Sequence, residues 1–390
     1  MKRGPTGRFA PSPPFEGERV RAFVPFALPP VPPLDVSGPL REAYDAALLS
    51  IGRLDSVSLL LPDTALLLYT FLRKEAVLSS QIEGTQSSLS DLLLFELDSA
   101  PGAPLEDVRE TSRYVNALEH GMRRLAEHFP LSNRLIRELH AALLSRGRGS
   151  DKSPGEFRST QNWIGGLRPG LAHFVPPPPE EVPVCMAELE RFLNDRPTRT
   201  PTLIKAALAH VQFETIHPFL DGNGRVGRML IPMIMVSDGL LKDPLLYLSV
   251  FFKQHRAQYY ELLQAVRTSG DWENWLAFFL EGVRATAVTA IATARALATM
   301  FQEDRRLIQN LSSGAGSALR VHESLQKHPI QTISSLSQST QLTIPTVTAA
   351  LARLAKCHLV VELTGKQRGK VYGYRQYLKI LESGPLGESR

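Results

Sequence analysis

Apolar residues recur along most of the chain at intervals of three or four positions, which is the spacing of one buried face of an α-helix. Runs that favour β-strands are short and confined to 157–175 and 359–374. The chain is therefore predicted to be mainly α-helical. Helices are expected at 39–60, from 64 towards 79, and at 89–97, 108–129, 132–144, 180–194, 203–215, 229–236, 251–267, 271–280 and 283–311.

Two of these predicted helices meet at a short turn. The first, 203–215, should end near His217, because Pro218 disfavours the helical conformation in the residue before it. The second should begin near Gly224, and its run 229–236 is apolar on all sides, which is typical of a buried helix. The turn between them therefore lies at the start of a buried helix.

The start of the second helix carries residues suited to an anion. Gly222, Asn223 and Gly224 place backbone amides at a helix N-terminus, where the helix dipole also favours negative charge. Glycines let the backbone approach a phosphate closely. Arg225 and Arg228 are three positions apart, so both side chains can reach phosphate oxygens. The turn is predicted to bind phosphate.

Two further side chains add chemistry to the turn. Asp221 offers hard oxygen ligands for Mg²⁺, which proteins usually hold with one or two carboxylates plus substrate phosphates. His217, with an ordinary pKa of about 6.5, is suited to take a proton from an attacking hydroxyl. Each residue alone is more often structural. The combination favours function, because basic side chains oppose the dipole at a helix start unless an anion is present.

The stretch 217–228 resembles the signature of the Fic family, His-x-Phe-x-(Asp/Glu)-Gly-Asn-Gly-Arg-x-x-Arg, and matches it at every defined position. The resemblance implies transfer of AMP from ATP to protein hydroxyls. It makes His217 the base, which Phe219 wedges in place, and Asp221 the Mg²⁺ ligand. The residues that it implies for nucleotide binding are Gly222, Asn223 and Gly224 as the anion hole, Arg225 and Arg228 as clamps on the outer phosphates, and Val226 and Gly227 within the same stretch.

A second motif lies at the end of the helix that starts near residue 64. Ser79, Glu83 and Gly84 match the inhibitory helix of the same family, (Ser/Thr)-x-x-x-Glu-(Gly/Asn). Alone, this pattern indicates only a helix that ends at a glycine cap. Beside the signature, the resemblance implies that Glu83 pairs with Arg228 and fills the space of the ATP γ-phosphate. ATP would then bind with its α-phosphate misplaced for attack.

The segment 157–175 breaks the helical pattern with two β-prone runs around a connection rich in glycine and proline, which predicts a β-hairpin. The resemblance implies a flap at 162–175 that holds a target protein by strand pairing. A surface hairpin without a role is the alternative. Tyr259 and Tyr260 are candidates for the adenine pocket or for core packing, and adjacent helical residues cannot both face one site.

A change of pattern marks the C-terminal part of the chain. After the linker 312–316, three short helical patterns are followed by two β-prone runs around the basic segment 365–370. This order resembles a winged helix-turn-helix, whose third helix enters the major groove of DNA. The predicted third helix has few of the side chains that read base edges. Dimerisation or docking is as well supported as DNA binding, so a homodimer stays open.

Composition places these elements in an ordinary globular protein. The 390 residues are 43% hydrophobic and 21% charged, and the net charge of +5 permits an anionic partner without requiring one. Cys185 and Cys357 form no disulfide framework, so a cytoplasmic location is expected. The longest apolar run is too short for a bilayer, and no secretory signal opens the chain, so no membrane partner is expected.

Four parts follow from these patterns. Prolines throughout 1–36 exclude a regular helix and predict an extended arm on a domain surface. The other parts are an N-terminal helical region with the inhibitory helix at 37–115, a Fic-type catalytic core with a β-hairpin flap at 116–311, and a winged helix-turn-helix domain at 317–390.

The function predicted is a protein adenylyltransferase that uses ATP and Mg²⁺ on a Ser, Thr or Tyr hydroxyl, including its own, and is inhibited by Glu83. Two alternatives keep the same site: transfer of another phosphate-containing group, or removal of AMP. A third is a nucleotide-sensing DNA-binding regulator. A P-loop NTPase is disfavoured, because the chain has no Gly-x-x-x-x-Gly-Lys-(Ser/Thr) run.

Overall fold

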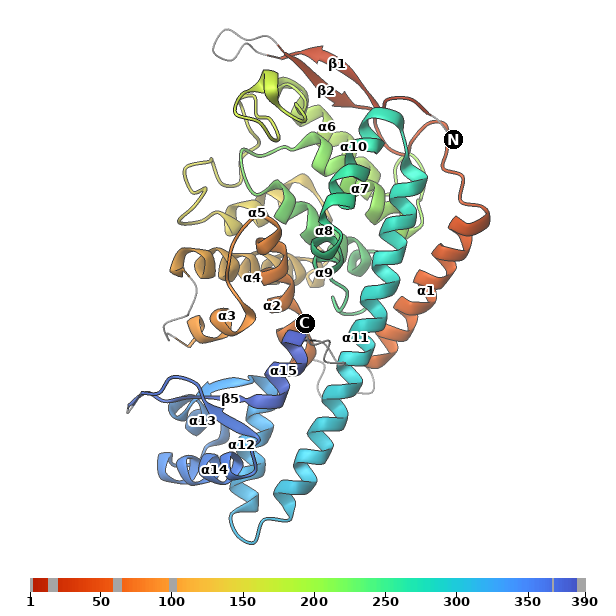
Figure 1. Ribbon diagram of the computed structural model, residues 1–390. Coiled ribbons are helices and arrows are strands. Elements are labelled where there is room, and N and C mark those ends of the chain that lie inside the picture. The colour runs from red at the N-terminus through yellow and green to blue at the C-terminus, as the bar shows by residue number, and fades with distance from the viewer. Residues whose placement is uncertain (1–2, 13–19, 59–64, 98–103, 367, 384–390) are drawn as a thin grey trace.

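A computed structural model of the chain describes residues 3–12, 20–58, 65–97, 104–366 and 368–383 (Figure 1). The predicted helix start at Thr64 and residue 367 of the basic segment lie outside these ranges. The described residues are mainly helical, which confirms the fold class. The helices are α1 (Gly38–Ser58), α2 (Ala65–Ile82), α3 (Leu89–Phe95), α4 (Leu105–Ala126), α5 (Asn133–Leu143), α6 (Val182–Leu193), α7 (Thr202–Ile216), α8 (Asn223–Ser237), α9 (Ser249–Gln254), α10 (Arg256–Ser269), α11 (Trp272–Gln309), α12 (Ala315–Lys327), α13 (Ile333–Thr340), α14 (Ile344–Lys356) and α15 (Arg375–Ser383), with short 3-10 turns at Pro169–Leu171 and Pro179–Glu181.

The centre of the molecule is the helix pair α7 and α8 (Figure 1). Every side chain of α7 from Leu203 to Ile216 is buried, and α8 is buried over most of its length. The two helices cross closely at Gly227, where an added Cβ would lie 2.6 Å from Glu214 Oε1. A Cβ here would crowd the side chains of α7, so the Glu214 carboxyl group would have to shift.

The predicted end of α7 is confirmed. His217 caps the helix with φ of 48°, a left-handed conformation that few residues other than glycine adopt, and its amide donates to Phe213 O at 2.9 Å. Gly222 precedes α8 with φ of 76°. The chain therefore reverses between α7 and α8 within the 217–224 turn.

A long helix, α11, runs beside α1 along one side of the molecule (Figure 1). The sequence predicted separate helices at 271–280 and 283–311, but α11 is one helix of 38 residues. The separation was wrong because nothing between the two patterns interrupts helical geometry. By length and composition α11 could cross a membrane, although 56% of its most apolar stretch is buried within the structure. That burial is usual for the core helix of a globular protein.

The N-terminal arm contains a β-hairpin that the sequence analysis missed. Strands β1 (Gly7–Pro11) and β2 (Arg21–Pro25) pair antiparallel, with Phe9 opposite Phe23. Their rings lie 5.5 Å apart edge to face. The many prolines hid this hairpin, in which Pro11 and Pro25 occupy strand ends, where proline is tolerated. The arm does lie on the surface, where Phe23 N donates to Val175 O at 2.9 Å.

The C-terminal part has the element order expected of a winged helix-turn-helix. Helices α12, α13 and α14 pack beside a three-stranded antiparallel sheet of order β3–β5–β4. The strands are β3 (Ile330–Thr332), β4 (Val360–Glu362) and β5 (Val371–Tyr374). Strand β3 and helix α15 were not predicted. DNA binding and a homodimer both stay predictions.

One predicted domain boundary falls inside a continuous helix. Helix α4 runs through residues 115 and 116, whereas α11 ends at Gln309, before the predicted linker at 312–316, after reaching from the core to the C-terminal part (Figure 1). Helix α15 turns back towards α2, where Lys74 Nζ donates to Leu381 O at 2.7 Å. The boundaries stay predictions.

Candidate active site

The 217–224 turn is held together by the side chain of Asn223. Its Oδ1 accepts from Phe219 N and its Nδ2 donates to Phe219 O, both at 2.8 Å. The first helical bond of α8 runs from Val226 N to Gly222 O at 3.1 Å. The amides of Asn223, Gly224 and Arg225 therefore precede this bond and point outward from the helix start, as an anion site requires.

His217 is placed by contacts to its backbone. Arg158 Nε donates to His217 O at 3.0 Å, and Arg158 also bonds the carbonyls of Thr160, Pro177 and Ile216. The imidazole Nδ1 is buried and has no hydrogen-bond partner among the described residues. Burial, with the positive charges of Arg267 and Arg158, lowers the pKa of His217 to about 3. The ring is therefore neutral and has a free nitrogen.

Phe219 supports the turn from beneath. Its ring is buried and stacks on His140, with centroids 3.7 Å apart and planes 7° apart. His140 Nδ1 accepts from Gly155 N at 2.8 Å, so Nε2 carries the proton and donates to Asp221 O at 3.0 Å. Phe219 and Val226 both lie in the interior. Their part in nucleotide binding stays a prediction.

Asp221 stands at the edge of the turn with its side chain 37% exposed. Oδ1 accepts from Gly222 N at 2.5 Å and lies 3.3 Å from Arg225 Nη2. The described residues contain no group of three or more His, Cys, Asp or Glu suited to a metal ion. A single exposed carboxylate beside a phosphate site still fits Mg²⁺, whose other ligands are commonly phosphate and water.

Arg225 is occupied by a partner that the sequence did not reveal. Its Nη1 donates to Glu110 Oε1 at 2.5 Å, and both side chains are buried. Arg148 Nη1 lies 3.6 Å from Glu110 Oε2, so the loop at 146–150 closes over this pair. Only Nε of Arg225 is buried without a partner. In this structure Arg225 braces α8 against α4, and its proposed contact with phosphate requires the Glu110 pair to rearrange.

The inhibitory motif meets the signature as predicted from the resemblance. Arg228 Nη2 donates to Glu83 Oε1 at 2.6 Å and to Ser79 O at 3.0 Å, while Nε donates to Ser79 Oγ at 2.8 Å. Burial opposes the charge of Glu83, but Arg228 outweighs it and lowers the pKa. A Cβ on Gly224 would collide with Glu83 Oε1. The Glu83 carboxylate therefore lies directly over the helix start.

The two tyrosines face different ways. Tyr259 is buried and its hydroxyl bonds His210 Nε2 at 2.8 Å. Tyr260 is 42% exposed, and the guanidinium carbon of Arg256 lies 5.5 Å from its ring centroid. Tyr260 is thus the one available to a ligand, while Tyr259 packs in the core.

The 162–175 flap is smaller than the predicted hairpin. A single antiparallel bridge joins Ile164 and Phe174, with Ile164 N donating to Phe174 O at 2.8 Å. Regular strands do not form there, because Gly165 and Gly166 both take positive φ next to the bridge. Asn162 Nδ2 donates to Phe219 O at 3.0 Å, so the flap is tied to the 217–224 turn.

Sequence reasoning missed the residues that act through long-range contacts. Arg158, Glu110 and Asn162 all hold the site, but none belongs to a recognisable motif. Glu214 was also missed. It is buried beside Gly227, its Oε1 has no partner among the described residues, and burial raises its pKa to about 7. The local signal was a carboxylate in a helix whose apolar spacing predicted burial.

Comparison with known proteins agrees with the geometry. The model for the Fic/DOC family N-terminal region matches residues 41–123, and the model for the Fic/DOC family matches residues 130–235. The protein adenylyltransferase Fic of Drosophila grimshawi is 31% identical over 220 residues, which cover 56% of this chain and 39% of that protein. The chain thus spans well under half the length of this curated relative.

Two solved structures share the fold. A Fic family protein from Desulfovibrio desulfuricans G20 aligns with a TM-score of 0.56 at 19% identity, covering 87% of this chain and 96% of its own. Fic-1 from C. elegans aligns with a TM-score of 0.50 at 25% identity, covering 66% and 74% respectively.

Proposed function

Because this chain is a member of the Fic/DOC family, we propose that it transfers AMP from ATP to a Ser, Thr or Tyr hydroxyl of a protein, which includes its own chain. One observation carries the proposal. A neutral imidazole stands at the end of α7, in the same turn as the amides that open α8. Curated relatives named as protein adenylyltransferases support the same reaction.

The nucleotide binds through its phosphates. The amides of Asn223, Gly224 and Arg225 receive one phosphate at the start of α8, where the helix dipole favours negative charge. Arg228 offers a buried guanidinium for the outer phosphates once Glu83 leaves it. Mg²⁺, when held by Asp221, supplies positive charge that offsets the charge of the phosphates. Tyr260 is the exposed aromatic side chain suited to stack on the adenine.

Transfer then needs one proton movement and one displacement. His217 takes the proton of the target hydroxyl, and the oxygen bonds to the α-phosphorus as the bond from that phosphorus to the bridging oxygen of pyrophosphate breaks. Charge that develops on the phosphoryl oxygens faces the amides that open α8. Pyrophosphate leaves, and AMP remains on the target.

The low pKa of His217 fits this role. A neutral ring is ready to accept a proton, and positive neighbours help to keep it neutral in the absence of nucleotide. Negative phosphates beside the ring favour its protonated form and raise its pKa. When substrate is present, the pKa of His217 therefore rises towards the working pH. General base catalysis is most efficient when the pKa of the base lies near that pH.

The chain inhibits itself through Glu83. The carboxylate holds Arg228 at 2.6 Å and lies over Gly224, so it occupies the space that the outer phosphate would take. Ser79 holds the same guanidinium through two further bonds, which fixes α2 in this position. Displacing Glu83 frees both the arginine and the space above the helix start.

The target protein docks on the 162–175 flap by pairing with its backbone. The flap has only one internal bridge, and Leu167 and Leu171 are exposed at its tip. Main-chain pairing makes small demands on target sequence.

The cytoplasmic location stays a prediction that rests on two free cysteines, Cys185 and Cys357.

Intact-mass analysis after incubation with ATP and Mg²⁺ tests the proposal. Wild type, Glu83→Gly and the double variant Glu83→Gly/His217→Ala are compared. We expect added AMP on Glu83→Gly, little on wild type and none on the double variant. An added phosphate, or loss of AMP from a premodified protein, would support one of the other transfer reactions. AMP transfer by the double variant would show that His217 is not the base.

A further inference from the structure

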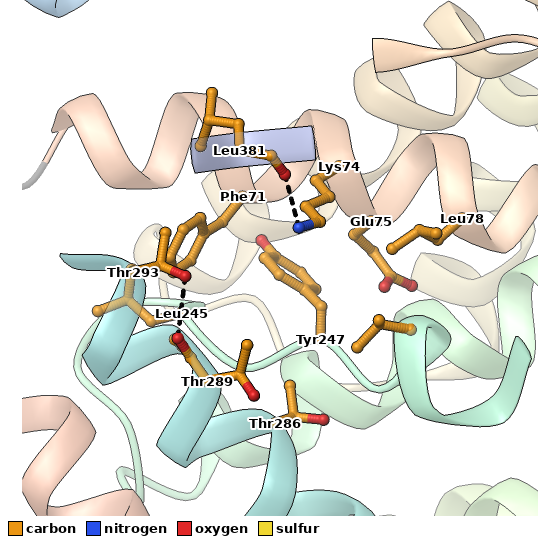
Figure 2. A pocket seen from close by; sticks show the side chains of 12 residues that line it. Phe71, Lys74, Glu75, Leu78, Leu245, Tyr247, Thr286, Thr289, Thr293 and Leu381 are labelled. Atoms are coloured by element: carbon orange, nitrogen blue, oxygen red, sulfur yellow. Dashed lines mark hydrogen bonds between the residues drawn. The ribbon is translucent and has the colours of Figure 1, made fainter. Parts of the chain in front are cut away.

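A cavity of about 70 Å³ lies between α2, α11, α15 and the segment that leads into α9 (Figure 2). Its wall is mostly apolar and includes Phe71 and Leu78 from α2, Leu245 before α9, and Ala290 from α11. Leu381 from α15 completes one side. The cavity is separate from the 217–224 turn, and none of the residues assigned to AMP transfer lines it.

Two hydroxyl groups in this wall have no hydrogen-bond partner. Tyr247 is 7% exposed and Thr286 is 9% exposed, and their oxygens are buried and unpaired among the described residues. A buried polar group without a partner is unfavourable, so such groups commonly mark a bound molecule or water. Burial raises the pKa of Tyr247 well above its usual range, so its hydroxyl keeps its proton and can donate.

Lys74 adds a positive charge to the same wall. Its Nζ donates to Leu381 O at 2.7 Å; burial lowers the pKa of Lys74, and the negative charge of Glu382 opposes that shift. An ammonium group has three donors, so two remain available. In Figure 2 the Tyr247 hydroxyl points towards the Lys74 side chain. A donor hydroxyl and a cation therefore converge at one end of the cavity.

The acidic residue in the wall already has its partners. Glu75 Oε1 accepts from Ser249 Oγ at 2.5 Å and from Tyr114 OH at 3.0 Å. In Figure 2 its carboxyl group points away from the Lys74 amine. The groups left without partners in the cavity can all donate, and its surface is otherwise apolar. The complementary ligand is an acceptor with negative charge and a small apolar body.

We propose that this cavity binds a short aliphatic carboxylate, with the carboxylate group at Lys74 and Tyr247 and the alkyl chain against Phe71, Leu78 and Ala290. The volume limits the length of the chain. An apolar cavity of about 150 Å³ holds benzene, so 70 Å³ admits only a smaller molecule, such as acetate or propionate.

Calorimetric titration of the full chain with sodium acetate, propionate, butyrate and octanoate tests the site. Sodium chloride keeps the ionic strength constant in every titration. We expect saturable binding of the short members and weaker binding of octanoate, which is too long for the cavity. Tyr247→Phe removes one hydrogen bond to a charged group, so binding should weaken by about ten-fold or more.

Thr289→Val is the matched control, because Thr289 lines the same wall but already donates its hydroxyl to Ala285 O at 3.0 Å. It should bind as the wild type does. Lys74→Met should abolish binding, and thermal unfolding of each variant shows that it is folded. Absence of saturable binding to the wild type, equal affinity of Tyr247→Phe and wild type, or a crystal structure with only water in the cavity at saturating acetate would overturn the proposal.

Discussion

The contact between Glu83 and Arg228 gives a graded prediction. Glu83→Gln keeps the shape of the side chain and removes its charge. A hydrogen bond to a charged group contributes about 1.5–3 kcal/mol. In the wild type both groups are charged, whereas in Glu83→Gln only Arg228 keeps its charge, so the bond weakens but is not lost. The Glu83 side chain is 35% exposed, so solvent screening brings the difference towards about 1 kcal/mol. That corresponds to about five-fold in the equilibrium between held and released Glu83.

The initial rate of AMP incorporation from labelled ATP measures this effect. We expect Glu83→Gln to be about five-fold faster than wild type, since release of the contact limits access of ATP. Glu83→Gly should be faster still, because it removes every contact and also clears the space over Gly224. Glu281→Gln, in an exposed pair with Arg284, is the control and should match wild type. A folded Glu83→Gln variant no faster than wild type would refute inhibition through this ion pair.

Three other residues give independent tests. Gly227→Ala should lower the free energy of unfolding, measured by urea denaturation, by about 1–3 kcal/mol, because the added Cβ would lie 2.6 Å from a Glu214 oxygen. Gly52→Ala is the control: its Cβ meets open space, so this variant should be more stable than the wild type. Burial raises the pKa of Glu214 from about 4.5 to about 7, so the wild type loses stability as the pH rises from about 4.5 to about 7. Glu214→Gln should gain stability relative to the wild type over that window, and parallel stability curves would contradict this. Arg158→Met should lower kcat with little effect on ATP affinity, because it releases the carbonyl of His217; unchanged kcat in the folded variant would show that this clamp is not needed.

Local patterns predicted much of the fold. The end of α7 and the start of α8 followed from Pro218 and the glycines, because these residues act on the backbone within a few positions. The apolar faces of α2 and α14 followed from helical spacing. The N-terminal hairpin did not, because its pairing joins residues whose local sequence is dominated by proline. The single helix α11 was predicted as two helices because its apolar pattern changes along the chain. No residue between the two patterns ends a helix.

The candidate site was predictable where a motif carried it. The match of Ser79 and Glu83 to one motif, and of Arg228 to another, indicated a contact that the structure contains at 2.6 Å. Glu110 lies 115 positions before its partner Arg225, and no local spacing connects them. Arg158 similarly reaches the carbonyl of a residue 59 positions away. Such clamps depend on how the helices pack, which periodicity does not determine.

A crystal structure of Glu83→Gly with ATP and Mg²⁺ tests the central claim most directly. The account predicts a phosphate on the amides that open α8, Arg228 on an outer phosphate, and the α-phosphorus facing the imidazole of His217. A phosphate chain bound elsewhere, or an imidazole turned into the interior in that complex, would contradict it.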